Sequence, residues 1–153
     1  MPPPSAAVRA GRALARLSRI LEQSSSQAGL SLAQYRVLVL VAEHPQRASA
    51  LAARVDVRRA TLSAVVGGLE RAGLLVRHAV AGDARGVQLE LTARGRAALA
   101  SVDRHLGDQL AEMAAAGSVG EVEMLAGLLE GLVHGFEIRR SVDTPPGEMA
   151  LRS

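Results

Sequence analysis

The chain has 153 residues, of which 48% are hydrophobic, so it can bury a core and is too apolar for a disordered chain. Aromatic residues make up only 1%, which excludes the base-stacking surfaces of single-strand binding proteins. The formal net charge is +3, all 18 basic residues are arginine, and the absence of cysteine excludes disulfides and Cys-based zinc sites. We expect a cytoplasmic protein without membrane association, because no apolar run has the length of a membrane span or signal peptide.

Residues 1–5 are rich in proline and are predicted to be disordered. A helix follows, because apolar residues recur at three- and four-residue steps from Val8 to Leu21. Ser24, Ser25 and Ser26, with Gly29, are predicted to end it. Ser31 and Gln34 have the spacing of a capping box, which predicts a second helix that stops near Pro45.

The middle of the chain has the pattern of a helix-turn-helix. A short helix is expected from about residue 48, with Leu51 on its buried side, and Asp56 is suited to the tight turn that follows. The second helix is predicted to run from Arg59 to Ala72. Its buried stripe consists of Leu62, Val65, Val66 and Leu69, and Gly73 occupies the position of a C-terminal cap.

The opposite face of this second helix is the candidate DNA-reading surface. Arg58, Arg59, Thr61 and Ser63 lie at or near its N-terminal end, the end that enters the major groove in helix-turn-helix proteins. An arginine there can donate a forked pair of hydrogen bonds to guanine, and the hydroxyls can reach phosphates or a base edge. The same pattern also fits an ordinary amphipathic helix with a solvated face.

A hairpin is predicted next. Residues 75–80 form a β-rich run, residues 87–91 alternate as a half-buried strand does, and glycines at 82 and 86 supply turn chemistry. Asp83 and Arg85 then fall at the tip, where the arginine can enter a minor groove and the aspartate can hold it. The alternative is a solvent-exposed turn with an incidental pair. Residues 54–96 hold eight arginines against four acidic residues, so positive charge is concentrated here.

Two long helices complete the chain. Thr92 is a good N-cap for the first, and Gly117 with Ser118 separates it from the second. Their apolar stripes cannot all be buried within one small lobe, which predicts self-association. The candidate dimerisation residues are Leu14, Leu17, Leu110, Leu125, Leu129, Leu132 and Phe136.

The order of these elements resembles the MarR family of bacterial transcription regulators. The residues that carry the resemblance are Leu51-Ala52, the run Leu69-Glu70-Arg71-Ala72-Gly73-Leu74, Asp83-x-Arg85, and Leu91-Thr92-x-x-Gly95-Arg96. The resemblance implies a mainly α, winged helix-turn-helix fold with a homodimer held by the N- and C-terminal helices. It also implies binding to a palindromic operator, usually as a repressor, and release by a small ligand that is often phenolic.

The resemblance gives the expected organisation. Residues 31–92 form the winged helix-turn-helix DNA-binding region, residues 6–30 and 93–140 form the dimerisation region, and residues 141–153 form a flexible tail. The expected partners are a pseudo-palindromic double-stranded operator, a second copy of the chain, and a small aromatic or lipophilic effector. Tyr35, Arg12, Arg16 or His44 could line the effector pocket, although Tyr35 also fits the core. No enzymatic activity, metal site or cofactor is expected, because no catalytic constellation or paired metal-ligand spacing is present.

The chain departs from the family pattern in its reading helix. An arginine often follows the serine of that helix in the family, whereas Ser63 is followed by Ala64, and the next turn is Gly67-Gly68. Two glycines within a helix cost about 1 kcal/mol each relative to alanine. A winged-helix protein-interaction module with weak or no DNA binding therefore remains an alternative to a DNA-binding regulator.

Overall fold

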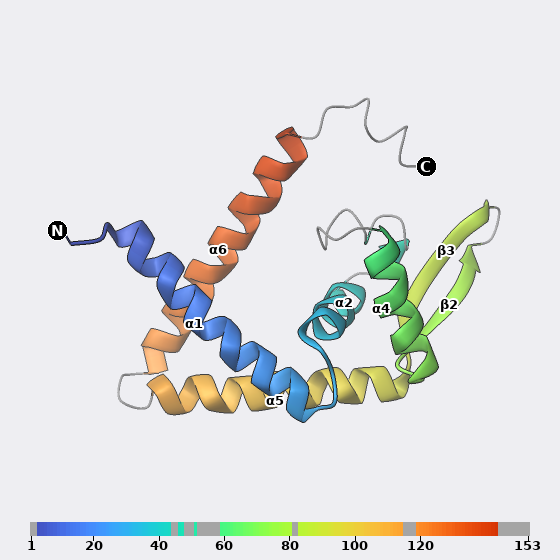
Figure 1. Cartoon of the computed structure of the whole chain (residues 1–153), viewed down its shortest axis with the longest axis horizontal. Helices are drawn as coiled ribbons and strands as arrows, with labels where there is room; N and C mark the ends of the chain where they lie inside the picture. The colour runs from blue at the N-terminus through green and yellow to red at the C-terminus, as the bar shows by residue number, and fades with distance from the viewer. Residues whose placement is uncertain are drawn as a thin grey trace. The chain divides into compact units, whose positions relative to one another are not determined.

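A computed structural model describes residues 3–43, 46–47, 51, 59–80, 83–114 and 119–143. The fold is mainly α with a small antiparallel sheet, as predicted (Figure 1). The helices are α1 (Ala6–Gln27), α2 (Leu32–Glu43), α4 (Arg59–Arg71), α5 (Ala93–Ala114) and α6 (Val119–Asp143). The strands are β1 (Gln46–Arg47), β2 (Leu75–Val80) and β3 (Asp83–Leu91). Residues 1–106 and 107–153 form two compact units.

Helix α1 ends where the sequence predicted. It begins after Ser5, whose hydroxyl accepts the Val8 N–H at 3.3 Å, and it ends at Gln27, between the three serines and Gly29. The serines belong to its last turns, where the Ser25 hydroxyl donates to the Leu21 carbonyl at 2.7 Å. Gly29, with φ 72°, makes the turn that ends it.

Helix α2 begins with the predicted capping box. The Gln34 side-chain oxygen accepts the Ser31 N–H at 2.8 Å, and the Ser31 hydroxyl accepts the Gln34 N–H at 3.2 Å. These two bonds satisfy N–H groups that a helix N-terminus otherwise leaves without partners. The helix ends at Glu43, close to the predicted stop at Pro45, which itself lies outside the described residues.

The sheet has the order β1-β3-β2, and all its pairs are antiparallel. The predicted hairpin is formed by β2 and β3, whose register places Leu75 opposite Leu91 at the base. Strand β1 was not predicted; it is two residues long and pairs Gln46 with Leu89. Within the predicted helix before the turn, the structure describes only Leu51, which is helical and fully buried.

The far end of the hairpin differs from the prediction. Ala79 pairs with Val87, but the next residue, Val80, pairs with Asp83. Asp83 and Arg85 therefore belong to β3, and residues 81–82 lie outside the described residues. The change in register between these pairs is an irregularity of the β-bulge type, which locally bends a strand and redirects its side chains.

One core holds the first unit together. It consists of buried aliphatic side chains from α2, α4, α5, the two long strands and the segments between elements: Leu30, Val37, Leu38, Val41, Leu51, Leu62, Val66, Leu69, Leu74, Leu75, Leu89, Leu91 and Val102. The predicted stripe of α4 is confirmed for Leu62, Val66 and Leu69, while Val65 is half-buried. Because these side chains fix one side of α4 against the core, its opposite side faces solvent.

The second unit contains the end of α5 and the whole of α6. Several large apolar side chains of α6 are exposed in the single chain, including Leu128 at 62% and Leu132 at 64%. None of the helices in the described ranges combines the length and apolarity needed to cross a bilayer.

Candidate nucleic-acid interface

The outward face of α4 is the centre of the candidate interface. Thr61 and Ser63 are exposed on it, as predicted, and so is Ala64. The structure describes Arg59 as the first residue of α4 but not its side chain, and Arg58 lies outside the described residues. The structure therefore shows that both hydroxyl side chains are exposed, while a contact of any of these four residues with DNA stays a prediction.

The C-terminal end of α4 is closed by the predicted glycine cap. Gly73 has φ 68°, the Gly73 N–H donates to the Glu70 carbonyl, and the Leu74 N–H donates to the Leu69 carbonyl, both at 2.9 Å. This pair of bonds is the Schellman motif, which stops a helix within one turn. Strand β2 begins immediately afterwards, so the helix and the hairpin are joined by very little chain.

Thr92 joins this cap to the next helix. Its hydroxyl accepts the Gly95 N–H at 2.9 Å, which makes it the N-cap of α5, and donates to the Gly73 carbonyl at 2.7 Å. The Thr92 N–H donates to the Leu74 carbonyl at 3.1 Å. The end of α4, the base of the hairpin and the start of α5 therefore meet at the carbonyl groups of Gly73 and Leu74. We call the four residues that make these contacts (Gly73, Leu74, Thr92 and Gly95) the junction.

Gly95 allows α5 to approach the junction closely. A Cβ atom at this position would stand 2.0 Å from the Leu74 carbonyl oxygen and 3.2 Å from Leu91 Cδ2. Only glycine fits this distance without movement of the backbone. The sequence offered Gly95 only through a family resemblance; its steric role depends on a contact with a residue 21 positions earlier.

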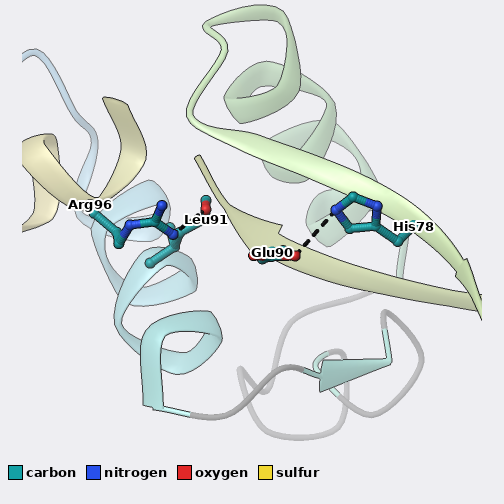
Figure 2. Close-up of polar contacts among 4 residues, drawn as sticks. All are labelled: His78, Glu90, Leu91 and Arg96. Carbon is teal, nitrogen blue, oxygen red and sulfur yellow. Dashed lines mark hydrogen bonds and ion pairs between the residues drawn. The ribbon is translucent and has the colours of Figure 1, made fainter. Parts of the chain in front are cut away.

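Polar contacts join the two strands of the hairpin to each other and the hairpin to α4 and α5. Arg77 Nε on β2 lies 2.8 Å from Glu70 Oε1 at the end of α4. Figure 2 shows His78 and Glu90 facing each other across β2 and β3, with Nε2 and Oε2 3.2 Å apart. In the same view Arg96 reaches back from α5, where its Nη1 donates to the Leu91 carbonyl at 2.7 Å. The two ion pairs are at the surface, so each contributes at most about 1 kcal/mol. Of the three contacts, those of Arg77 and Arg96 join the hairpin to α4 and α5, and that of His78 with Glu90 joins its two strands.

Comparisons with known proteins agree with this geometry. A model of the MarR family matches residues 28–86. The Mycobacterium tuberculosis transcriptional regulator MOSR, whose structure was solved in complex with DNA, is 31% identical with a TM-score of 0.61. The match covers 90% of this chain and 99% of that one. The chain belongs to the MarR family. Its fold is the winged helix-turn-helix of a DNA-binding transcription regulator.

Other members of the MarR fold are also similar. NadR in complex with 4-hydroxyphenylacetate is 27% identical, with a TM-score of 0.66 over 87% of this chain and 98% of that chain. The apo form of wild-type MarR from E. coli has a TM-score of 0.73 at 22% identity, over 86% and 98% of the two chains, which shows a likeness of fold alone. No protein of curated function matches the chain in sequence.

In MarR-family terms the hairpin is the wing. The side chains of Asp83 and Arg85 lie outside what the structure describes, so their pairing and their reach stay predictions. The backbone nevertheless places both residues in β3 at the far end of the wing, next to the register change. Arg85 therefore belongs to the part of β3 that lies between the pairs Val80–Asp83 and Ala79–Val87.

A hollow of about 280 Å³ lies beside the base of the wing. It is bounded by the end of α2, the end of β3 and the first half of α5; the lining residues are Val41, Ala42, Glu90, Leu91, Arg96, Leu99, Ala100 and Asp103. Its size is near the lower limit for small-molecule sites. Tyr35, Arg12 and Arg16, which the sequence suggested for an effector pocket, do not line it, and His44 lies outside the described residues.

Tyr35 is nevertheless connected to this hollow through Asp103. The Tyr35 hydroxyl donates to Asp103 Oδ1 at 3.0 Å, and the ring packs against the core. Burial, the hydrogen bond to Asp103 and the negative charge of Asp103 together raise the pKa of Tyr35 to about 12, and burial is the largest of the three causes. Tyr35 thus has the core position that the sequence favoured and a polar partner that the sequence could not identify.

The predicted dimerisation residues fall into two classes of exposure. Leu14, Leu125, Leu132 and Phe136 are exposed in the single chain, whereas Leu17, Leu110 and Leu129 are half-buried. Sequence reasoning missed three further exposed apolar side chains of α6, namely Met124, Leu128 and Val133. At 100° per residue, the apolar positions of α6 cover about half of its circumference, which is wider than a two-helix seam. In the described residues, no group of three or more potential metal-binding side chains occurs.

Proposed function

We propose that this chain is a sequence-specific double-stranded DNA-binding regulator that acts as a homodimeric repressor and is released by a small aromatic or lipophilic ligand. The observation that carries the proposal is the junction, because it holds the outward face of α4 and the wing in one fixed arrangement. The DNA complex of MOSR, a relative at 31% identity, supports the same use of this fold.

In this proposal, residues 31–92 contact one half of the operator. Thr61 and Ser63 face the major groove with Arg58 and Arg59 at the entry of α4, where arginine can pair with guanine or phosphate. Arg85 on the wing enters the adjacent minor groove, where the potential is most negative. The excess of arginine over acidic residues between positions 54 and 96 favours this surface over the remainder of the chain.

The dimer rests on residues 6–30 and 93–140. Exposed aliphatic side chains of α6, with Leu128 and Leu132 both more than 60% exposed, form a surface larger than a monomeric helix normally leaves in water. A second copy of the chain is the expected cover. Two-fold symmetry then requires a pseudo-palindromic operator with half-sites about one helical turn apart, roughly 34–36 Å.

The hollow beside the wing is our candidate effector site. Aliphatic side chains form its floor, and it adjoins Glu90, which pairs with His78 of β2, and Arg96, which bonds the last residue of β3. A ligand in this position would touch the base of the wing and could alter its orientation. NadR was solved with 4-hydroxyphenylacetate, an aromatic ligand of suitable size.

Fluorescence anisotropy with the DNA that flanks the protein's own gene tests the proposal. We expect saturable binding that resists non-specific competitor and weakens with salt. Arg85→Ala should weaken binding to all sequences and reduce the salt slope by about two ions per dimer, since one phosphate-region contact is lost from each wing. Arg104→Ala, which removes an exposed arginine from α5, is the matched control and should change neither quantity.

The alternative is a winged-helix protein-interaction module with weak or no DNA binding. It is favoured by the small side chains on α4, where Ala64, Gly67 and Gly68 replace longer residues. Failure of the wild-type protein to show any competitor-resistant binding, at low salt and with a selected pool of duplexes, would favour this alternative. Specific binding would eliminate it.

A further inference from the structure

We propose that the outward alanines of α4, Ala60 and Ala64, contribute to operator recognition by contacting the 5-methyl groups of thymine. The inference rests on the proposed function, because it assumes that α4 enters the major groove. It concerns the chemistry of recognition, which neither the fold nor membership of the family determines.

The first support is the composition of the line that points away from the core. Leu62, Val66 and Leu69 fix the buried side of α4. At 100° per residue, the positions opposite them are 60, 64, 67 and 71. The residues there are Ala60, Ala64, Gly67 and Arg71, and both alanines are exposed. From Ala60 to Gly67 the line is about 10 Å long at 1.5 Å per residue, which matches roughly three base pairs at 3.4 Å each.

The second support is the position of the polar side chains. The hydroxyls of Thr61 and Ser63 lie about 70–90° to either side of this line, on its two flanks. They are suited to the phosphates on the two walls of the groove, while the methyl groups of Ala60 and Ala64 face its floor. A methyl group cannot donate to guanine O6 or N7, and the thymine methyl is the only apolar group on the major-groove edges.

The third support explains the two glycines. A Cβ atom on Gly67 would stand 3.4 Å from Arg71 Nη1, and one on Gly68 would stand 3.6 Å from Gln34 Nε2. The Arg71 guanidinium therefore lies back along the helix, over the surface that the glycines leave open. The only long side chain of the outward line therefore lies beside Gly67 and Gly68, and the part of the line from Ala60 to Ala64 carries methyl groups alone. The glycines position Arg71 and allow close approach.

These observations predict the kind of sequence that binds. Each half-site should contain adjacent thymines, on either strand, beneath Ala60 and Ala64. Discrimination should come from methyl contact and shape, and should be smaller per base pair than a forked arginine–guanine pair gives.

The test uses the wild-type protein and an operator selected from a random duplex pool. Thymines are replaced one at a time by deoxyuridine, which removes the methyl group and keeps every hydrogen-bonding group. We expect binding to weaken about three- to fivefold at one or two neighbouring positions in each half-site, the factor that corresponds to burying one methyl group. Deoxyuridine between the half-sites is the control and should have no effect.

Ala64→Gly then assigns the contact. In this variant the uracil-to-thymine ratio of affinities should fall to about 1 at one position and remain unchanged at the other. Because the ratio is taken within one protein, any loss of folded material cancels. Tight, specific binding that ignores every thymine methyl would overturn the inference and leave the proposed function intact. Absence of any specific binding would overturn the proposed function, and the inference with it.

Discussion

Gly95→Ala should destabilise the protein even though alanine is the better helix former. The new Cβ would lie 2.0 Å from the Leu74 carbonyl oxygen, so α5 or the backbone at Leu74 has to move by about 1 Å. That carbonyl accepts the Thr92 N–H at 3.1 Å, so the movement also weakens a bond of the junction. Overpacking of this kind costs about 1–3 kcal/mol, and the weakened bond about 1 kcal/mol.

The gain in helix propensity offsets at most about 1 kcal/mol of this cost. We therefore expect a net loss of about 1–3 kcal/mol, seen as a decrease in Tm of about 3–10 °C for a chain of this length. Gly107→Ala in the same helix is the control, because a Cβ there meets nothing within 4 Å. It should raise stability by up to about 1 kcal/mol.

Thermal and urea unfolding, followed by circular dichroism at one protein concentration, measure both variants under conditions in which association is constant. If Gly95→Ala were as stable as the wild type, or if Gly107→Ala lost as much as Gly95→Ala, the steric account of the junction would be refuted.

Three further predictions concern the remaining contacts. Tyr35 is the only tyrosine and there is no tryptophan, so absorbance near 295 nm reports the ionisation of Tyr35 alone. Tyr35 should ionise near pH 12. Its contribution to the free energy of unfolding should be complete below pH 10 and lost as the pH rises through 12. Asp103→Asn should lower that pKa but keep it above 10, because burial is the larger cause; a wild-type value of 10 in the folded protein would contradict the assignment. Thr92→Val should lower the free energy of unfolding in urea by about 1–2 kcal/mol, and Thr92→Ser by much less, because serine keeps the hydroxyl that bonds Gly73 and Gly95. Equal losses in the two variants would show that the hydroxyl is unimportant. Leu128→Asp should convert a dimer into a folded monomer in light scattering; a wild-type monomer would exclude the proposed interface.

Local chemistry made much of the fold predictable. Ser31 with Gln34, Gly73, and Thr92 each combine a residue type with a spacing that satisfies the free groups at a helix end, and each acts as predicted. The buried stripe of α4 followed from its helical period. The end of α1 was predictable in the same way, because Gln27 lies between the three serines and Gly29, whose positive φ makes the turn.

What the sequence could not supply depends on residues that are distant along the chain. Strand β1 has only two residues and no β-rich run, so its pairing with Leu89 is set by the fold around it. The bond between Tyr35 and Asp103 spans 68 positions. Arg85 was expected at the tip because glycines flank it, but β3 begins at Asp83 and so includes Arg85 and Gly86.

Three elements, α4, the wing and α5, are attached to one another at Gly73 and Leu74. The effect of an inserted residue therefore depends on its position along the wing. A residue inserted near these carbonyls would rotate β2 relative to α4 and separate Glu70 from Arg77. Added residues at positions 81–82 would leave that attachment unchanged and alter only how far the wing extends. Lengthening the wing at its far end, or substituting the outward residues of α4, should therefore change the binding surface and leave the attachment at Gly73 and Leu74 unchanged.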